Sequence, residues 1–250
     1  MFRSLKIFTP VSAALVFVFA AGPGIAQELG EFSAYYQART NGMRGEAERH
    51  LLRQADGHYR LDVSLEARML GVPLGKLKQS SVFKYEYGII QPADYSYQVT
   101  GITRDYESVD FDWDTGSALS QEDDNSWTVE LGDTTLDQLS YQVALALRLE
   151  EGNAGIGDEF EFEIVDGPNL ETHLYRLTAE EILETPLGEL NTVKLERIRN
   201  NNSGRVTNIW LARDWDYVIT KIEQNNPDGL RLKLELENAI LNGQPVQPLP

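Results

Sequence analysis

The sequence has 250 residues, no cysteine and a formal net charge of −17, from 39 acidic and 22 basic residues. The lack of cysteine excludes disulfide bonds, thiol chemistry, a c-type haem site and a lipid-modified N-terminal cysteine. The negative charge repels nucleic acids and anionic membrane surfaces, so we expect no nucleic-acid partner.

The first 26 residues predict a cleavable secretory signal peptide. Arg3 and Lys6 give a positive start, residues 11–21 form an apolar segment, and the small residues before position 27 predict cleavage after Ala26. The apolar segment is too short to span a bilayer, so we expect no stable membrane insertion; an uncleaved anchor is the alternative. Removing 26 residues from 250 leaves 224, with a charge of −19 once Arg3 and Lys6 are lost. We expect a periplasmic protein with one β-rich domain over residues 27–240 and a flexible tail over 241–250.

Strand periodicity dominates the first half of the mature chain. Apolar and polar residues alternate most clearly over residues 59–68, which predicts a strand with one buried face. Further strands are predicted at residues 32–40, 46–54, 76–87, 95–99, 104–113 and 127–131. The pair Asn41-Gly42 predicts a two-residue hairpin turn.

Residues 133–150 form the one long segment with helical periodicity, and we predict a helix over about 134–150. One face carries Leu136, Leu139, Val143 and Leu147, and the opposite side carries Tyr141, Leu145 and Leu149. Thr135 and Gln138 have the spacing of a capping box, and Asp133 or Thr134 are alternative caps. Because the helix is apolar on two sides, we expect other elements to cover both.

Strand patterns resume after the helix, at about residues 159–164, 171–179, 193–195, 205–212, 217–224 and 230–237. Together these patterns predict a mainly β fold, in which a large, curved antiparallel sheet, an open or spiral barrel, packs around one central helix. Residues 73–77 and 186–190 are similar to each other, which indicates either duplicated halves or a chance match.

No motif for chemistry stands out. His50, His58 and His173 lack metal-ligand spacing, and the chain has no nucleophile elbow or phosphate-binding loop. We therefore expect no cofactor, no metal and no enzymatic activity. A hydrolase whose site is assembled from distant segments is an alternative.

Residues 110–116, DFDWDTG, place an aspartate at every second position, and further carboxylates follow at 122–124. A calcium loop uses a similar spacing, but its glycine would fall one place earlier and its bidentate glutamate where Gln121 stands. A strand that exposes its aspartates explains the pattern more simply.

A cleft between sheet and helix is the site that the pattern favours for a ligand. The candidate lining residues are apolar or aromatic side chains of the helix segment and of nearby strands: Leu136, Leu139, Tyr141, Val143, Leu145, Phe111, Trp113 and Trp210. Such side chains also make up the ordinary core of a β protein.

Several segments in the same order resemble the domain of unknown function 3108 family over about residues 32–236. They are SVDFDW at 108–113, LDQLS at 136–140, TPLG at 185–188, IWLA at 209–212, KIEQ at 221–224 and DG at 228–229. The resemblance implies an exported, β-rich bacterial protein. It implies no activity, because the family has none established and no catalytic residues can be carried over. Family members often have a proline within the stretch that corresponds to residues 216–219, and this chain has none there.

Two hypotheses about function follow. The first is a non-enzymatic periplasmic protein that binds a lipid or a lipidated molecule in the cleft, by analogy of fold with lipoprotein carriers and receptors. The second is an assembly factor for envelope or surface-polymer components. It would contact an envelope protein through the acidic outer row Glu159, Glu161 and Glu163.

Overall fold

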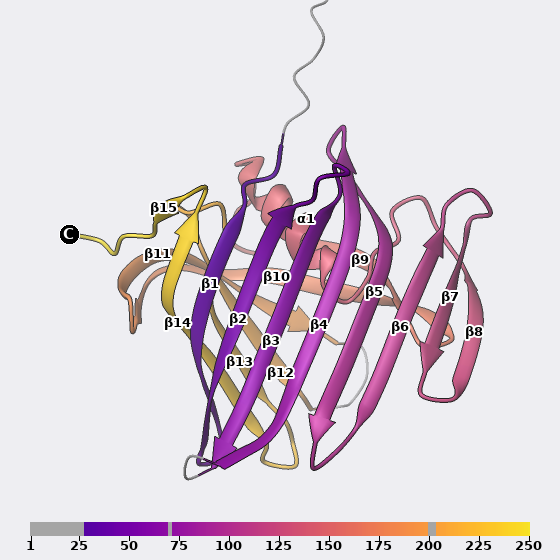
Figure 1. The fold of residues 1–250 in the computed structure, drawn as a ribbon. Helices are drawn as coiled ribbons and strands as arrows, with labels where there is room; N and C mark the ends of the chain where they lie inside the picture. Colours follow the sequence, from indigo (N-terminus) through magenta and orange to yellow (C-terminus); the bar gives the residue numbers. More distant parts are fainter. Residues whose placement is uncertain (1–27, 70–71, 200–203) are drawn as a thin grey trace, which may run out of the picture.

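The computed structural model describes residues 28–69, 72–199 and 204–250, so the predicted signal peptide lies outside the described residues (Figure 1). One antiparallel sheet holds every strand of these ranges, and one α-helix interrupts their succession. The elements are β1 (Phe32–Thr40), β2 (Met43–Arg53), β3 (Tyr59–Met69), β4 (Val72–Glu86), β5 (Ile89–Gly101), β6 (Asp105–Asp112), β7 (Ser117–Glu122), β8 (Asn125–Glu130), α1 (Ser140–Glu150), β9 (Glu159–Asp166), β10 (Asn169–Thr185), β11 (Gly188–Ile198), β12 (Val206–Ala212), β13 (Ile219–Asn225), β14 (Arg231–Leu241) and β15 (Gln244–Pro245).

The sheet consists of two meanders that meet in its middle. Its strand order is β8-β7-β6-β5-β4-β3-β2-β1-β14-β13-β12-β11-β10-β9, with β15 added to β14. Strand β1 therefore pairs with both β2 and β14, which joins the start of the described chain to its end. The sheet curves strongly, and α1 lies on its concave side near one end (Figure 1). The predicted fold, a curved antiparallel sheet around one helix, is confirmed.

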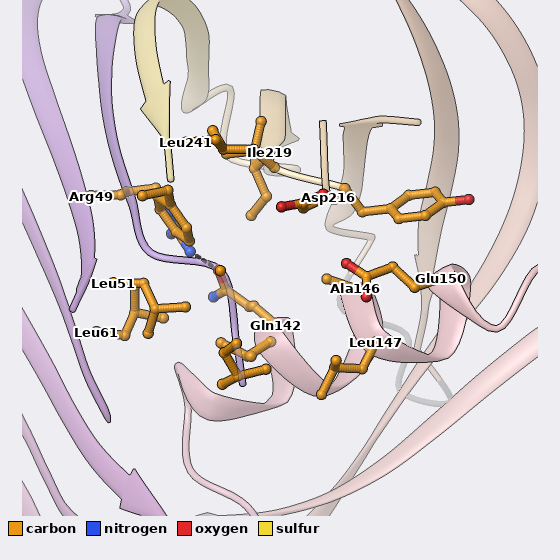
Figure 2. Close-up of a pocket in the computed structure, with 16 residues that line it drawn as sticks. Arg49, Leu51, Leu61, Gln142, Ala146, Leu147, Glu150, Asp216, Ile219 and Leu241 are labelled. Atoms are coloured by element: carbon orange, nitrogen blue, oxygen red, sulfur yellow. Dashed lines mark hydrogen bonds between the residues drawn. The ribbon is translucent and has the colours of Figure 1, made fainter. Parts of the chain in front are cut away.

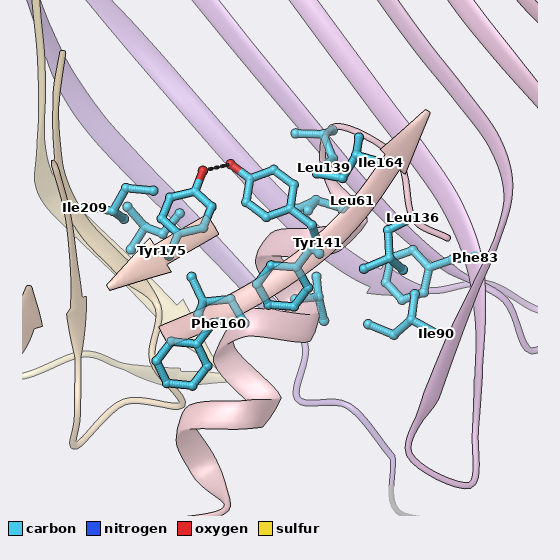
Figure 3. Packing of buried hydrophobic residues seen from close by; sticks show 14 of the residues in the cluster. Leu61, Phe83, Ile90, Leu136, Leu139, Tyr141, Phe160, Ile164, Tyr175 and Ile209 are labelled. Atoms are coloured by element: carbon cyan, nitrogen blue, oxygen red, sulfur yellow. Dashed lines mark hydrogen bonds between the residues drawn. The ribbon is translucent and has the colours of Figure 1, made fainter. Parts of the chain in front are cut away.

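Alternation along the strands decides which side chains enter the core. In β3, Tyr59 and Leu61 are buried, and the register places Leu61 beside Leu51 of β2 and Ser81 of β4. These inward side chains and the helix form one large core, part of which Figure 3 shows around Tyr141. A smaller core lies around β1 and β14. The predicted turn at Asn41-Gly42 is present, with both residues at positive φ (39° and 88°) as a type I′ hairpin requires.

The helix begins six residues later than the predicted start at 134. Residues before Ser140 are not helical because Leu136 pairs with the edge strand β9: its N–H donates to the Glu163 carbonyl at 2.9 Å, and its carbonyl accepts from the Val165 N–H at 3.1 Å. The Thr135 hydroxyl donates to the Glu163 carboxylate at 2.7 Å, so it does not cap the helix. The segment before the helix thus covers the backbone of one sheet edge.

The two similar segments do not occupy equivalent places. Residues 73–77 lie within β4, whereas residues 186–187 are the turn between β10 and β11. This difference gives no support to the duplication alternative.

The last residues pack on the sheet and do not form the flexible tail that the sequence predicted. Val246 is buried and its N–H donates to the Ala239 carbonyl at 2.9 Å, while the Leu249 N–H donates to the Glu189 carbonyl at 2.8 Å. Within the described ranges, the model contains no helix that is both long enough and apolar enough to cross a membrane.

Candidate functional site

A pocket opens between α1 and the strands that face it, β1, β2, β3, β13 and β14 (Figure 2). Its cavity volume is about 60 Å³. Apolar side chains make up most of the lining: Leu29, Phe32, Leu51, Leu61, Val143, Ala146, Leu147, Val218, Ile219 and Leu241. The polar side chains in the lining are Arg49, Gln142, Glu150 and Asp216, together with Tyr217.

Arg49 occupies an inward position of β2. Ala47 and Leu51, two residues to either side, are both buried core residues, so alternation turns the Arg49 side chain to the same face of the sheet. Its exposed fraction is 6 %. An arginine at such a position is unusual, because a buried charge is costly unless it is paired.

The guanidinium of Arg49 has no carboxylate partner among the described residues. Nη2 donates to the Gln142 Oε1 at 2.7 Å, and the buried Nε has no hydrogen-bond partner. Burial lowers the pKa of Arg49, with the hydroxyls of Tyr36 and Tyr141 acting in the opposite direction. Arginine stays protonated in proteins, so the pocket contains a positive charge that no carboxylate of the described chain contacts.

Two carboxylates, Glu150 and Asp216, lie across the pocket from Arg49 (Figure 2). Burial, and then the charge of Asp216, raise the pKa of Glu150. Asp216 and Tyr217 both have positive φ, 47° and 51°, in the turn between β12 and β13, and Asn242 donates to Asp216 at 3.4 Å. Left-handed backbone costs energy for a bulky side chain, so this turn at the pocket is held in place by its surroundings.

One of the eight residues predicted to line a cleft, Val143, lines this pocket. Leu136, Leu139, Tyr141 and Leu145 are buried in the main core, where the Tyr175 hydroxyl donates to the Tyr141 hydroxyl at 2.9 Å (Figure 3).

The other three predicted residues do not line this pocket. Phe111 stacks on Trp113, whose Nε1 donates to the Pro92 carbonyl at 2.6 Å. Trp210 faces the opposite side of the sheet from its core neighbours in β12, with the amino groups of Lys194 and Lys221 at 5.1 and 4.4 Å from its ring.

Sequence reasoning missed Arg49 and Gln142. The signal for Arg49 was present, because residues 47, 49 and 51 alternate with outward polar residues in a predicted strand. Arg49 is the charged residue at an inward position between two apolar ones, Ala47 and Leu51, and this exception to the alternation marks it in the sequence.

A second apolar surface lies at the other end of the sheet, on its core-facing side. Its main members are Met43, Leu65, Leu77 and Val99, and the register pairs Leu77 with both Leu65 and Val99. This groove has a volume of about 340 Å³ but lies open at the rim, and no buried charge lines it.

A serine, a histidine and a carboxylate meet on the outer side of β1 and β2. The His50 Nδ1 lies 3.0 Å from the Ser33 Oγ, and its Nε2 lies 3.4 Å from the Glu48 carboxylate. Both strands are interior to the sheet and their backbone amides take part in the ladders. An acyl-transfer site also needs free amide donors for an oxyanion, and these strands offer none beside Ser33.

The acidic stretches have local partners. Asp112 Oδ1 accepts hydrogen bonds from the Asp114 and Thr115 N–H groups, which is a turn-forming role. No group of three or more metal-ligating side chains is found within residues 28–69, 72–199 and 204–250. In the row on β9, Glu159 pairs with Arg176 and Glu163 accepts from Thr135, which leaves Glu161 as its unengaged member among the described contacts.

Comparison with known proteins places most of the chain in one family model. The model described as "Protein of unknown function (DUF3108)" matches residues 31–237. No curated protein matches the sequence.

Among solved structures, the chain is similar to the beta-barrel-like protein of domain of unknown function DUF1849 from Brucella abortus, with a TM-score of 0.56 and 11% identity over 85% of this chain and 98% of that chain. A weaker match is the MucA/MucB complex of Pseudomonas aeruginosa, with a TM-score of 0.15 and 11% identity over 83% of this chain and 88% of that chain. The first likeness shows a shared barrel-like fold, and the second is too low to support an argument.

Proposed function

The chain belongs to the DUF3108 family, and we propose that it is an exported, non-enzymatic protein that binds a lipid-like, amphipathic ligand between α1 and the sheet. The observation that carries this proposal is an apolar pocket left unfilled between the helix and the strands that face it. Protein interiors normally close such gaps, and concave, mostly apolar pockets with a few polar groups are typical of ligand sites.

The pocket must open further to admit a chain of methylene groups. A cavity of about 60 Å³ is small beside the roughly 300 Å³ or more that ligand pockets commonly hold. The closed pocket therefore accepts a head group, and an apolar chain follows when the helix moves outward.

The anchoring of α1 supports such a movement. Its start is fixed by hydrogen bonds of Asp137 and by the pairing of Leu136 with β9. In contrast, no side chain of residues 144–150 makes a hydrogen bond or an ion pair within the described structure, and three of these residues line the pocket: Ala146, Leu147 and Glu150. Core packing of Leu145 and Leu149 holds the last two turns, and we propose that they move away from β2 when a ligand enters, with the first turn as the pivot.

We test this function with a fluorescent apolar dye and with native mass spectrometry of protein purified from the periplasm. Ala146→Phe fills the pocket, so we expect it to abolish dye binding and any co-purified lipid mass. Leu77→Phe places the same ring in the groove at the open rim and serves as the matched control, with binding unchanged. Loss of binding in Leu77→Phe alone would move the site to that groove, and a wild-type protein that binds neither dye nor lipid would refute the function.

Export is tested on the same preparation. We expect the protein in the periplasmic fraction with Gln27 as its first residue, as the predicted cleavage after Ala26 requires. An N-terminus at Met1 in a membrane fraction would instead support the uncleaved anchor.

A further inference from the structure

We propose that the ligand is a monoanion, a single apolar chain that ends in one carboxylate, and that Arg49 binds this carboxylate at the inner end of the pocket. This inference rests on the proposed function and specifies the class of its ligand. It is carried by the contacts of one buried side chain and by the distribution of charge around the pocket.

Arg49 has no carboxylate within hydrogen-bonding distance among the described residues. Arg49 is 94 % buried, given its exposed fraction of 6 %, yet its hydrogen-bond partner is the neutral amide of Gln142. A guanidinium presents a planar fork of donors that matches a carboxylate, and its Nε here has no partner. A bound carboxylate would neutralise the charge and satisfy the donor that folding leaves unpaired.

The pocket is also small: its cavity volume of about 60 Å³ suits a compact anionic group such as a carboxylate. The neighbouring lining from Leu51, Leu61 and Val143 is apolar and suits the first methylene groups of a chain.

The far side of the pocket carries negative charge. Glu150 and Asp216 lie across the pocket from Arg49, so a second negative charge on the ligand would be repelled there (Figure 2). The arrangement therefore disfavours a second anionic group on the ligand.

The test compares three ligands by isothermal titration with the mature protein: dodecanoate, dodecanol and dodecanedioate. We expect dodecanoate to bind about tenfold or more tightly than dodecanol, since a charge-assisted hydrogen bond supplies at least this factor. Dodecanedioate should bind more weakly than dodecanoate. Equal binding of dodecanoate and dodecanol would overturn the role of Arg49 while the proposed function stands, whereas no binding of any of the three would refute both.

Variants locate the carboxylate. Arg49→Met should remove the preference for dodecanoate over dodecanol while keeping the binding of dodecanol. Arg49→Lys should retain part of this preference. Arg44→Met, on the same strand but exposed, is the matched control and should behave as wild type. Because a neutral side chain relieves an unpaired buried charge, Arg49→Met should fold with no loss of thermal stability. The inference would be overturned if Arg49→Met still preferred dodecanoate over dodecanol. It would also be overturned if the wild type bound dodecyl phosphate more tightly than dodecanoate.

Discussion

Glu107 is a partly buried carboxylate that lies close to several other acidic side chains. It lies on the core-facing side of β6, where the register pairs it with Tyr97 of β5 and Glu122 of β7. Burial is the largest cause that raises the pKa of Glu107, to about 7, followed by the charges of Asp105, Glu122, Asp166 and Asp123. The sheet has two edge strands, β8 and β9, and these groups come from both sides of the seam between them, so their repulsion acts on the closure of the sheet.

Replacing Glu107 by glutamine tests this repulsion. Because the pKa is higher in the folded protein than in the unfolded chain, the folded state binds the proton more tightly, and stability falls as the pH rises from about 4.5 to 7. Glu107→Gln removes this fall. We expect equal thermal midpoints of variant and wild type below pH 4.5, and a variant midpoint about 2 °C higher at pH 8, modest because the group is partly exposed to solvent. The exposed Glu161→Gln is the control, and a difference that does not depend on pH would contradict the explanation.

At the scale of an element, the start of α1 depends on Asp137. Its Oδ1 accepts the N–H groups of Leu139 at 2.7 Å and Ser140 at 2.8 Å, and its Oδ2 accepts the Ser81 hydroxyl of β4 at 2.6 Å. Asp137 is fully buried, and burial raises its pKa while these hydrogen bonds act in the opposite direction. This carboxylate both caps the helix and attaches it to the sheet.

We expect Asp137→Ala to lower the free energy of unfolding by about 2–4 kcal/mol, because it leaves two backbone donors and one hydroxyl without an acceptor. Urea titrations followed by circular dichroism measure the change. Asp137→Asn keeps an acceptor and should lose less, and the exposed Asp133→Ala should lose nothing measurable. If the alanine variant at 137 is as stable as that at 133, the capping role assigned to Asp137 is wrong.

The sequence predicted the strands better than the helix start for a physical reason. Strand alternation is local, and the patterns at 32–40 and 59–68 coincide with β1 and β3 within a residue. The start of α1 is decided by contacts with distant residues: Glu163 of β9 holds Thr135 and Leu136 in an extended conformation, and Ser81 helps to fix Asp137. The capping-box spacing of Thr135 and Gln138 cannot reveal that the Thr135 hydroxyl binds the Glu163 carboxylate and not the start of the helix.

The sequence predicted an apolar pocket between the helix and the sheet, but it did not predict most of the residues that line this pocket. A helix with apolar residues on two sides indicated a contact surface with the sheet, and Val143 does line the pocket. The aromatic residues Phe111, Trp113 and Trp210 were chosen by residue type, and type does not tell which side of a strand a tryptophan faces. Arg49 and Asp216 come from segments far apart in the sequence, and only the pairing of β1 with β14 brings those segments together.

At the scale of the whole molecule, backbone pairing holds the sheet from strand to strand, and we propose that the helix is the part that moves. The seam between the sheet edges is closed by the segment before α1, so the sheet cannot open there without breaking the pairing of Leu136 with Ile164. The last two turns of α1 have no such hydrogen bonds. Ligand entry should therefore change the distance between helix and sheet, and leave distances within the sheet unchanged.

Electron paramagnetic resonance between pairs of spin labels measures this movement, and the chain favours the method because it has no cysteine of its own. Labels at Glu151 and Leu52, both exposed, report on the end of α1 relative to β2. We expect saturating dodecanoate to lengthen this distance by about 4 Å, the contact distance that one layer of methylene groups requires. Labels at Leu52 and Ile240, both on the sheet, should show no change. If dodecanoate binds but both distances stay constant, the ligand does not enter beneath the helix, and the groove that contains Leu77 becomes the site to test next.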